Sequence, residues 1–401
     1  MNEQKFISEC IRAYSGDYDP KRLENLYRSV DLKKLDKLIT GQNIAGFFYY
    51  LYANNIFHKL NIPPEMAGLW KRTAGRNSLI NTFNDKEALW LAGLLNKNNI
   101  DYIYMKGLST RMRCYNNDYI KYSTDIDLFI RKIDYGRVKD ILLKNGYAIP
   151  RSHYIENVGI ATTFEEFEKN ENEISFVKKQ GSLVSIIDLQ WDFIDSDRTS
   201  VFHDLYNINS FYRFDSTDEL KIEDSTLKVF DLEAEFINMA FHYAFHHSFR
   251  GIQWLIDVCS FVKNHEASID FGPILEAAGK DLKKILGIIL MLAHEYNFRQ
   301  KMDISMRKLF CVDRLLPLEY RYYRSMAFKP VSGISNSISL LITKILLPYR
   351  MVDRMRAFKY MLFNPDSIGH RLESNKKDKK IFLPFYLFKL LIFDIIRKRN
   401  K

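Results

Sequence analysis

The spacing of apolar residues along the chain divides it into three parts. Through residues 1–99 apolar positions recur at helical intervals, and the series from Leu69 to Leu94 predicts one long helix. Residues 100–230 contain short runs rich in β-branched and aromatic residues, which are typical of strands. Helical intervals return over 231–401. We therefore expect an N-terminal helical region, a central core with a sheet, and a C-terminal helical domain with a basic tail.

The central part alternates strands with short helices. Its pattern predicts, in chain order, a strand at 100–105, a helix at 108–117, a strand at 122–130, a helix from Asp134 to Asn145, two strands at 173–177 and 183–191 joined at Gln180-Gly181, and a strand pair at 219–230. A sheet interleaved with helices and flanked by two helical regions makes the expected fold class α+β, with a small mixed β-sheet.

Two carboxylates interrupt the strand at 122–130, which reads Tyr-Ser-Thr-Asp-Ile-Asp-Leu-Phe-Ile. Side chains alternate faces along a strand, so Asp125 and Asp127 point the same way, with Cα atoms about 6.6 Å apart. Two like charges on one face repel each other unless a cation lies between them. A bound divalent cation is the economical explanation, and the alternative is a pair of solvated aspartates on an edge strand.

A third acid and a basic turn accompany this pair. Asp188 lies inside an apolar strand, where a lone carboxylate is costly unless it is paired or bound to metal. Lys106-Gly107 follows the first strand at the start of a helix. Glycine allows the backbone to approach a phosphate closely, and helix N-termini attract anions. The turn is therefore a predicted phosphate contact.

Together these features predict metal-dependent transfer of a nucleoside monophosphate from an NTP, with ATP as the first expectation and pyrophosphate as the leaving group. Asp125, Asp127 and Asp188 are the predicted catalytic residues and metal ligands, and Asp188 either bridges two ions or acts as a base. Mg²⁺, as one ion or two, is expected because the ligands are hard oxygens with no thiolate or imidazole cluster in the motif.

The order of these motifs resembles that of the nucleotidyltransferase-fold superfamily, which includes aminoglycoside and minimal antitoxin-type enzymes. It is more closely similar to the bacterial family of uncharacterised nucleotidyltransferases. The matching segments run over roughly residues 80–365, and they are Lys106-Gly107, Asp125–Leu128, Gly146-Tyr147, Asp188–Trp191, His242 with His246, and Trp254–Asp257. The resemblance implies a nucleotidyltransferase core and, within it, an NTP site at the first turn.

Three positions depart from the patterns of these groups. The superfamily usually carries Gly-Ser at the phosphate loop, and here Ser109 is the candidate substitute for that serine. Lys121 stands where the family often has arginine, which keeps the charge but loses bidentate phosphate geometry. Gln190 stands where histidine is usual. The expected nucleotide contacts are therefore Lys106, Gly107, Ser109 and Lys121.

The acceptor is open from the sequence, and a small molecule, a sugar derivative or a protein side chain all fit. An antitoxin-like enzyme that modifies a partner protein is one version of this hypothesis. The alternative function is a nucleotide-binding accessory module without transfer activity, docked to envelope or polysaccharide machinery through its basic tail.

Composition limits the partners. With 47% hydrophobic and 27% charged residues the chain is globular, and its net charge is +10. Residues 371–401 hold ten Lys or Arg against three acids, so this segment alone supplies +7. The near balance elsewhere argues against a large nucleic-acid surface. Four scattered cysteines without Cys-x-x-Cys spacing argue against a structural zinc site.

We expect a cytoplasmic protein, because free cysteines suit a reducing compartment and neither a secretory signal nor a spanning helix is evident. The basic and apolar segment at 376–401 suits peripheral contact with the inner face of a membrane, or with an acidic partner. A last helix packed on the core, with a solvated basic end, is the alternative for this segment.

Three histidines, His242, His246 and His247, cluster in the C-terminal part. A structural or substrate-facing role is favoured over zinc binding, because no third ligand is evident.

Other polar residues have two interpretations each. Asp257 is expected to cap a helix or to pair with a basic residue. Tyr122 stacks on a base or lies in the core, Arg250 reaches phosphate or lies on the surface, and either Arg111 or Arg113 faces the site.

Overall fold

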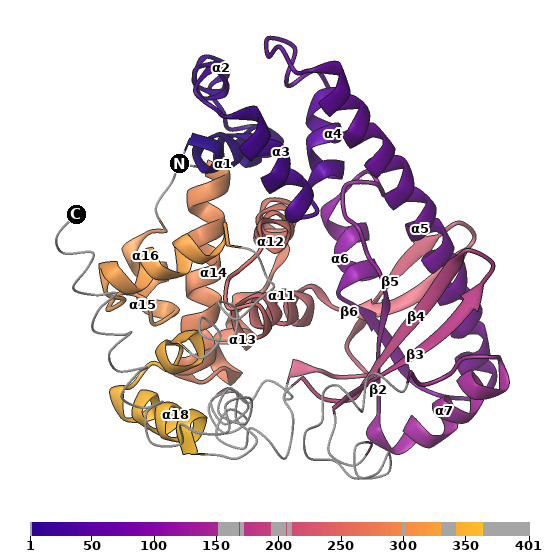
Figure 1. Ribbon diagram of the computed structural model, residues 1–401. Helices are drawn as coiled ribbons and strands as arrows, with labels where there is room; N and C mark the ends of the chain where they lie inside the picture. Colours follow the sequence, from indigo (N-terminus) through magenta and orange to yellow (C-terminus); the bar gives the residue numbers. More distant parts are fainter. Residues whose placement is uncertain are drawn as a thin grey trace, which may run out of the picture.

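The computed structural model describes residues 2–150, 172–193, 211–298, 302–329 and 342–363, together with Glu168 and Tyr206. The basic segment at 376–401 lies outside the described residues, so its predicted contacts stay predictions. The described chain consists of a mixed sheet with helices around it, which confirms the expected α+β class (Figure 1).

The strands of the described part form one sheet in the order β3-β4-β2-β1-β6-β5. Their bounds are β1 Tyr102–Met105, β2 Ile126–Ile130, β3 Glu173–Gln180, β4 Leu183–Gln190, β5 Thr217–Ile222 and β6 Ser225–Phe230. The pair β1–β2 is antiparallel, whereas β2–β4 and β1–β6 are parallel. The two central strands are buried along their whole length, which explains their nearly continuous apolar sequence.

Two hairpins form the edges of the sheet. The hairpin β3–β4 turns at Gly181, whose φ of +63° is a backbone conformation that glycine adopts without strain. The predicted turn at Gln180-Gly181 is therefore confirmed. The hairpin β5–β6 turns at Glu223, which has a φ of +52°. The two turns fix the register within the pairs β3–β4 and β5–β6.

Helices precede, interleave with and follow the strands. The first group is α1 Asn2–Ser15, α2 Pro20–Arg28, α3 Leu32–Gly41, α4 Ala45–Ala53 and α5 Pro64–Lys97. Within the core lie α6 Gly107–Cys114 and α7 Tyr135–Lys144, the latter entered through the 3₁₀ turn Lys132–Asp134. The last group is α11 Leu232–Phe241, the π-helix η3 His242–His246, α12 Ile252–His265, the 3₁₀ turn Glu266–Ser268, α13 Phe271–Ala277, α14 Lys280–Phe298, α15 Ile304–Leu309, α16 Pro317–Met326 and α18 Met351–Phe363.

The first and last groups of helices share one hydrophobic core. Helix α1 contacts α12 and α14, and Phe6 and Ile7 belong to the same buried cluster as Leu286. Ser15 Oγ donates a hydrogen bond to Asn297 Oδ1 at 2.8 Å. The predicted boundaries near residues 99 and 230 fall between α5 and β1 and between β6 and α11. The division into three domains stays a prediction.

The long helix α5 follows the predicted span, but polar residues occupy the middle of its buried face. Leu79, part of the apolar series, is 60% exposed. Asn77, Asn81 and Asn84 are buried instead, and their spacing places them along one face of the helix. The apolar pattern therefore predicted the helix correctly but did not reveal its polar inner face.

These three residues, which we call the asparagine ladder, hold the segment between α6 and β2. Asn77 Nδ2 donates to the Tyr119 carbonyl oxygen at 3.0 Å, and Asn84 Nδ2 donates to that of Ser123 at 3.1 Å. Asn81 Nδ2 donates to two carbonyl oxygens, those of Asp118 at 2.6 Å and Lys121 at 2.8 Å. The ladder thus supplies partners for the carbonyl groups of a segment that has no strand or helix of its own.

No helix in the described ranges is both long enough and apolar enough to cross a membrane.

Replacing Asn81 with alanine tests the asparagine ladder. The change removes two hydrogen bonds and leaves two carbonyl oxygens without them, so we expect Asn81→Ala to lower the free energy of unfolding by about 2–4 kcal/mol. Urea denaturation measures this. The neighbouring exposed Thr82 offers a matched control, and Thr82→Ala should change the stability by less than about 0.5 kcal/mol. Equal effects of the two substitutions would contradict the role assigned to the ladder.

Candidate functional site

Strand β2 brings the predicted acidic residues together. Asp127 is the register partner of Asp188 across the parallel pair β2–β4. Register partners on adjacent strands lie about 4.8 Å apart and direct their side chains to the same face. Asp125 immediately precedes β2, and all three carboxylates line one cavity of about 470 Å³. Residues that are 61 positions apart in sequence, Asp127 and Asp188, thus share one wall.

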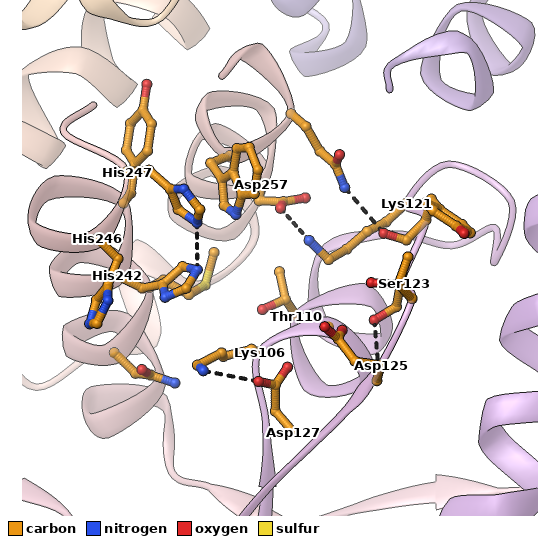
Figure 2. A pocket seen from close by; sticks show the side chains of 18 of the residues that line it. Lys106, Thr110, Lys121, Ser123, Asp125, Asp127, His242, His246, His247 and Asp257 are labelled. Atoms are coloured by element: carbon orange, nitrogen blue, oxygen red, sulfur yellow. Dashed lines mark hydrogen bonds and ion pairs between the residues drawn. The ribbon is translucent and has the colours of Figure 1, made fainter. Parts of the chain in front are cut away.

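Lys106 lines the same cavity, and Figure 2 shows its side chain beside that of Asp127. Its Nζ donates to Asp127 Oδ1 at 2.9 Å and to Gln190 Oε1 at 3.0 Å, and it lies 3.6 Å from Glu173 Oε2. Glu173 begins β3 and also lines the cavity. We call the four carboxylates that line the cavity, Asp125, Asp127, Glu173 and Asp188, the acidic wall. Within the described residues, the ammonium group of Lys106 is the positive charge in contact with this wall.

The turn Lys106-Gly107 is packed tightly. A Cβ atom at Gly107 would lie 1.9 Å from Ser123 Oγ, so a larger residue fits only if the Ser123 side chain moves. Lys106 itself has φ +48° and ψ −118°, a combination that glycine adopts readily and a lysine does not. Strain of this kind persists only where surrounding contacts determine the backbone, and it often marks functional sites.

The acidic wall carries more negative charge than Lys106 compensates. Burial, with repulsion from Asp127, raises the pKa of Asp125 to about 6. Burial also raises the pKa of Asp188 well above its ordinary value, and repulsion from Glu173 and Asp127 adds to this. Burial opposes the charge of Lys106, but attraction to Asp127 and Glu173 outweighs it and raises the pKa of the lysine. A further cation would relieve the remaining repulsion.

The chemistry of the wall fits a hard divalent cation. Its ligand atoms are carboxylate oxygens, which Mg²⁺ prefers. Asp188 Oδ1 is buried and has no hydrogen-bond partner within the described residues. Among those residues, however, no three acidic, histidine or cysteine side chains are already arranged as a metal site. The carboxylates provide the donors, and Lys106 occupies part of the space between them.

Lys121 also lines the cavity, but its charge is already neutralised. Its Nζ is hydrogen bonded to Asp257 Oδ2, and Tyr115 Oη donates to Asp257 Oδ1 at 2.5 Å. The expected pairing of Asp257 with a basic residue is confirmed. The backbone of Lys121 is held by the asparagine ladder, so a helix from each end of the chain, α5 and α12, fixes this lysine.

The phosphate loop differs from the sequence expectation at one position. The side chain of Ser109 is fully buried in α6 and is not among those that line the cavity, whereas Thr110 is. Thr110 Oγ1 donates to Glu235 Oε1 at 3.2 Å. Successive residues of a helix point about 100° apart, so a shift of one position exchanges the residue that faces the cavity.

Of the four other candidate residues named from the sequence, one lines the cavity and three do not. Tyr122 lines the cavity. Arg111 and Arg113 are ion-paired with Asp85 and Asp218, and neither lines the cavity. Arg250 is only 1% exposed and is also absent from the lining, so its expected surface position is not observed.

The histidines form the wall opposite the carboxylates (Figure 2). His242 Nε2 and His247 Nε2 lie 2.8 Å apart in a hydrogen bond that holds one proton, and the His247 ring stacks on Trp254 at 3.9 Å. Burial lowers the pKa of His246 and of His247 to about 3, with Lys106 adding to the effect. Burial and the neighbouring His247 lower the pKa of His242 as well. This wall is therefore neutral at ordinary pH.

Glu173 and Asn238 are among the cavity residues that the sequence did not predict. Glu173 was recognised only as a strand residue, although its position opposite Gln190 in the hairpin register was a usable signal. Asn238, one helical turn before His242, is buried with its Nδ2 lacking a partner among the described residues. Its polar character inside an otherwise apolar helix face was the available signal.

The model of a family described as uncharacterised nucleotidyltransferase matches residues 28–297. Among solved structures, the chain is similar to an antigenic nucleotidyltransferase-like protein from Paracoccidioides brasiliensis. That similarity has a TM-score of 0.33 at 13% identity and covers 61% of this chain and 96% of the other. No curated protein matches the chain.

The neutral histidine wall predicts a specific dependence of stability on pH. His246 has a folded pKa of about 3, whereas an unfolded histidine titrates near 6.5, so only the unfolded chain takes up this proton as the pH falls from 7 to 5. The contribution of His246 to the free energy of unfolding should therefore decrease by about 2 kcal/mol over this interval.

Urea denaturation of wild type and His246→Gln at pH 7 and pH 5 tests this. The variant should lose about 2 kcal/mol less than wild type between the two pH values, whatever its absolute stability. Equal losses in both proteins would show that His246 titrates normally in the folded state.

Proposed function

Because the chain belongs to the family of uncharacterised nucleotidyltransferases, we propose that it transfers a nucleoside monophosphate from an NTP to an acceptor hydroxyl. The observation that carries this proposal is the register of Asp127 with Asp188 beside Asp125, at the cavity where the Lys106-Gly107 turn ends β1. Carboxylates that lie beside a turn with a lysine and a glycine suit the binding of a metal-bound triphosphate.

In the proposed reaction, the acceptor oxygen attacks the α-phosphorus of the NTP. A bond forms between that oxygen and the α-phosphorus, the bond from the α-phosphorus to the bridging oxygen breaks, and pyrophosphate leaves. The hydroxyl proton passes to a carboxylate of the cavity. Asp188, the register partner of Asp127, would act as this base or would instead bridge two metal ions.

Asp125, Asp127 and Asp188 would hold Mg²⁺, as one ion or two. When bound, Mg²⁺ neutralises the triphosphate and stabilises the charge that develops on the leaving group. Lys106 and the backbone at Gly107 would contact the phosphates from the adjacent turn. Thr110 lines the cavity where Ser109 was expected. Lys121 remains a candidate phosphate contact, although its ammonium group is paired with Asp257.

The two walls of the cavity divide the proposed roles. The acidic wall and its turn would bind the NTP, whereas the neutral histidine wall from the C-terminal helices would face the acceptor. A neutral wall with a tryptophan and hydrogen-bonding imidazoles suits an acceptor that presents hydroxyl groups. Small molecules, sugar derivatives and protein side chains that carry hydroxyls all meet this description.

Binding of the NTP is tested by stabilisation. With Mg²⁺ and a non-hydrolysable ATP analogue at about 100 times Kd, we expect the free energy of unfolding of wild type to rise by about 2.7 kcal/mol. Asp188→Asn should remain folded, because it removes charge repulsion at nearly constant volume, and it should lose most of this rise.

Asp101→Asn is the matched control. Asp101 is an exposed aspartate just before β1, at the opposite end of this strand from Lys106, and its variant should respond to the ligand as wild type does. Wild type that fails to respond to Mg²⁺ and the analogue would remove the proposal.

Transfer itself is tested with α-³²P-labelled NTPs and a lysate as the source of acceptors. We expect label to appear in a product that depends on Mg²⁺ and disappears with Asp188→Asn. Label in a protein band would identify a protein acceptor, and label only in small molecules would exclude one. Nucleotide binding without any labelled product would favour the accessory module, which binds an NTP but transfers nothing.

A further inference from the structure

Lys106, the predicted phosphate contact, is ion-paired with carboxylates of the acidic wall. Its ammonium group contacts Asp127 at 2.9 Å, Gln190 at 3.0 Å and Glu173 at 3.6 Å. The lysine side chain is 17% exposed and that of Asp127 is 9% exposed, so water screens this pair poorly. Lys106 therefore acts in the free protein as the counter-ion of the acidic wall.

The backbone directs the lysine into this position. Residue 106 has a φ of +48° in a region that glycine favours, and Gly107 is pressed against Ser123. The carbonyl group of Ser123 is in turn held by Asn84 of the asparagine ladder. A chain of contacts from α5 thus sustains a strained backbone, which is expected where the orientation of the side chain matters.

The ammonium group competes with a metal ion for the same oxygen atom. Mg²⁺ binds a carboxylate oxygen at about 2.1 Å, so an ion on Asp127 Oδ1 would lie within a few ångströms of Lys106 Nζ and repel it.

We propose that Lys106 is a resident cation that Mg²⁺ and the NTP replace together: the metal takes Asp127, and the released ammonium group binds the triphosphate. This inference rests on the proposed function, because it requires NTP binding. Its consequence is thermodynamic coupling. Metal binds weakly to the free protein, since it must displace the lysine without a new partner for it, and each ligand strengthens the binding of the other.

The other cavity lysine does not share this role. Lys121 is paired with Asp257, which lies on α12 and not on the acidic wall. The negative charges that face Lys106 come from three strand segments, namely Asp125 and Asp127 at β2, Glu173 on β3 and Asp188 on β4. Among the described residues, replacing Lys106 therefore removes the cation that contacts the acidic wall.

The test measures Mn²⁺ binding by loss of the electron paramagnetic resonance signal of the free ion, with and without a non-hydrolysable ATP analogue. For wild type we expect weak binding alone and at least about tenfold tighter binding with the analogue. For Lys106→Met, which keeps the length but removes the charge, binding to the free protein should be at least about tenfold tighter than in wild type, and the effect of the analogue should shrink.

Two further variants make the outcome decisive. Lys106→Gly removes the charge and also relieves the positive φ, so it should fold even where the methionine variant does not, and it should show the same change. Lys178→Met is the control, because it removes a positive charge from β3 at a residue that does not line the cavity. Lys178 Nζ lies 3.3 Å from Glu87 Oε2, and the variant should bind Mn²⁺ as wild type does.

The results separate this inference from the proposed function. If wild type binds Mn²⁺ and the analogue but the Lys106 variants bind Mn²⁺ no more tightly and keep the full coupling, the resident-cation role is wrong and the proposed function stands. If wild type binds neither ligand, both are wrong.

Discussion

Repulsion between carboxylates on one wall of a small cavity is the constraint on which the surrounding structure depends. The parallel register of β2 and β4 sets Asp127 beside Asp188, and the hairpin from β4 back to β3 adds Glu173. Like charges at such distances destabilise a protein unless cations or hydrogen-bond donors compensate. The fold provides one such cation in Lys106, whose backbone has a strained, positive φ.

The support for this wall comes from both ends of the chain. The asparagine ladder of α5 satisfies the carbonyl groups of the segment that leads into β2, and α12 contributes the partner of Lys121. The histidine wall comes from the C-terminal helices and is kept neutral by burial. The charged wall and the neutral wall of the cavity are therefore carried by separate elements, namely the strands and the C-terminal helices.

The sequence was informative wherever a residue's surroundings were local. Strands β1 and β2 were predictable because burial on both faces requires an apolar run, and the two acids interrupting the second run were conspicuous for the same reason. The lone acid Asp188 was predictable from the cost of burying it. The family resemblance gave the order of these motifs, and the match over residues 28–297 confirms the family.

The features that escaped prediction depend on partners distant in sequence. The inner face of α5 is polar because it meets carbonyl groups about 40 residues away, which no apolar periodicity records. The choice between Ser109 and Thr110 depends on the rotation of a short helix against β1 and α12. The hydrogen bond from Lys106 to Gln190 joins residues 84 positions apart, and only the folded sheet brings them together.

The shared helical core also has a consequence for how the chain is made. Arg12 of α1 donates a hydrogen bond to the carbonyl oxygen of Glu295, 283 residues later, and the apolar face of α1 packs on the same helix. Closing so long a loop is slow, since its entropy must be lost before the contact is gained. During synthesis the first helices emerge from the ribosome well before α14 exists, with apolar side chains such as Phe6 and Ile7 lacking part of their native cover. The native packing of the first helices is therefore complete only after α14 has been made.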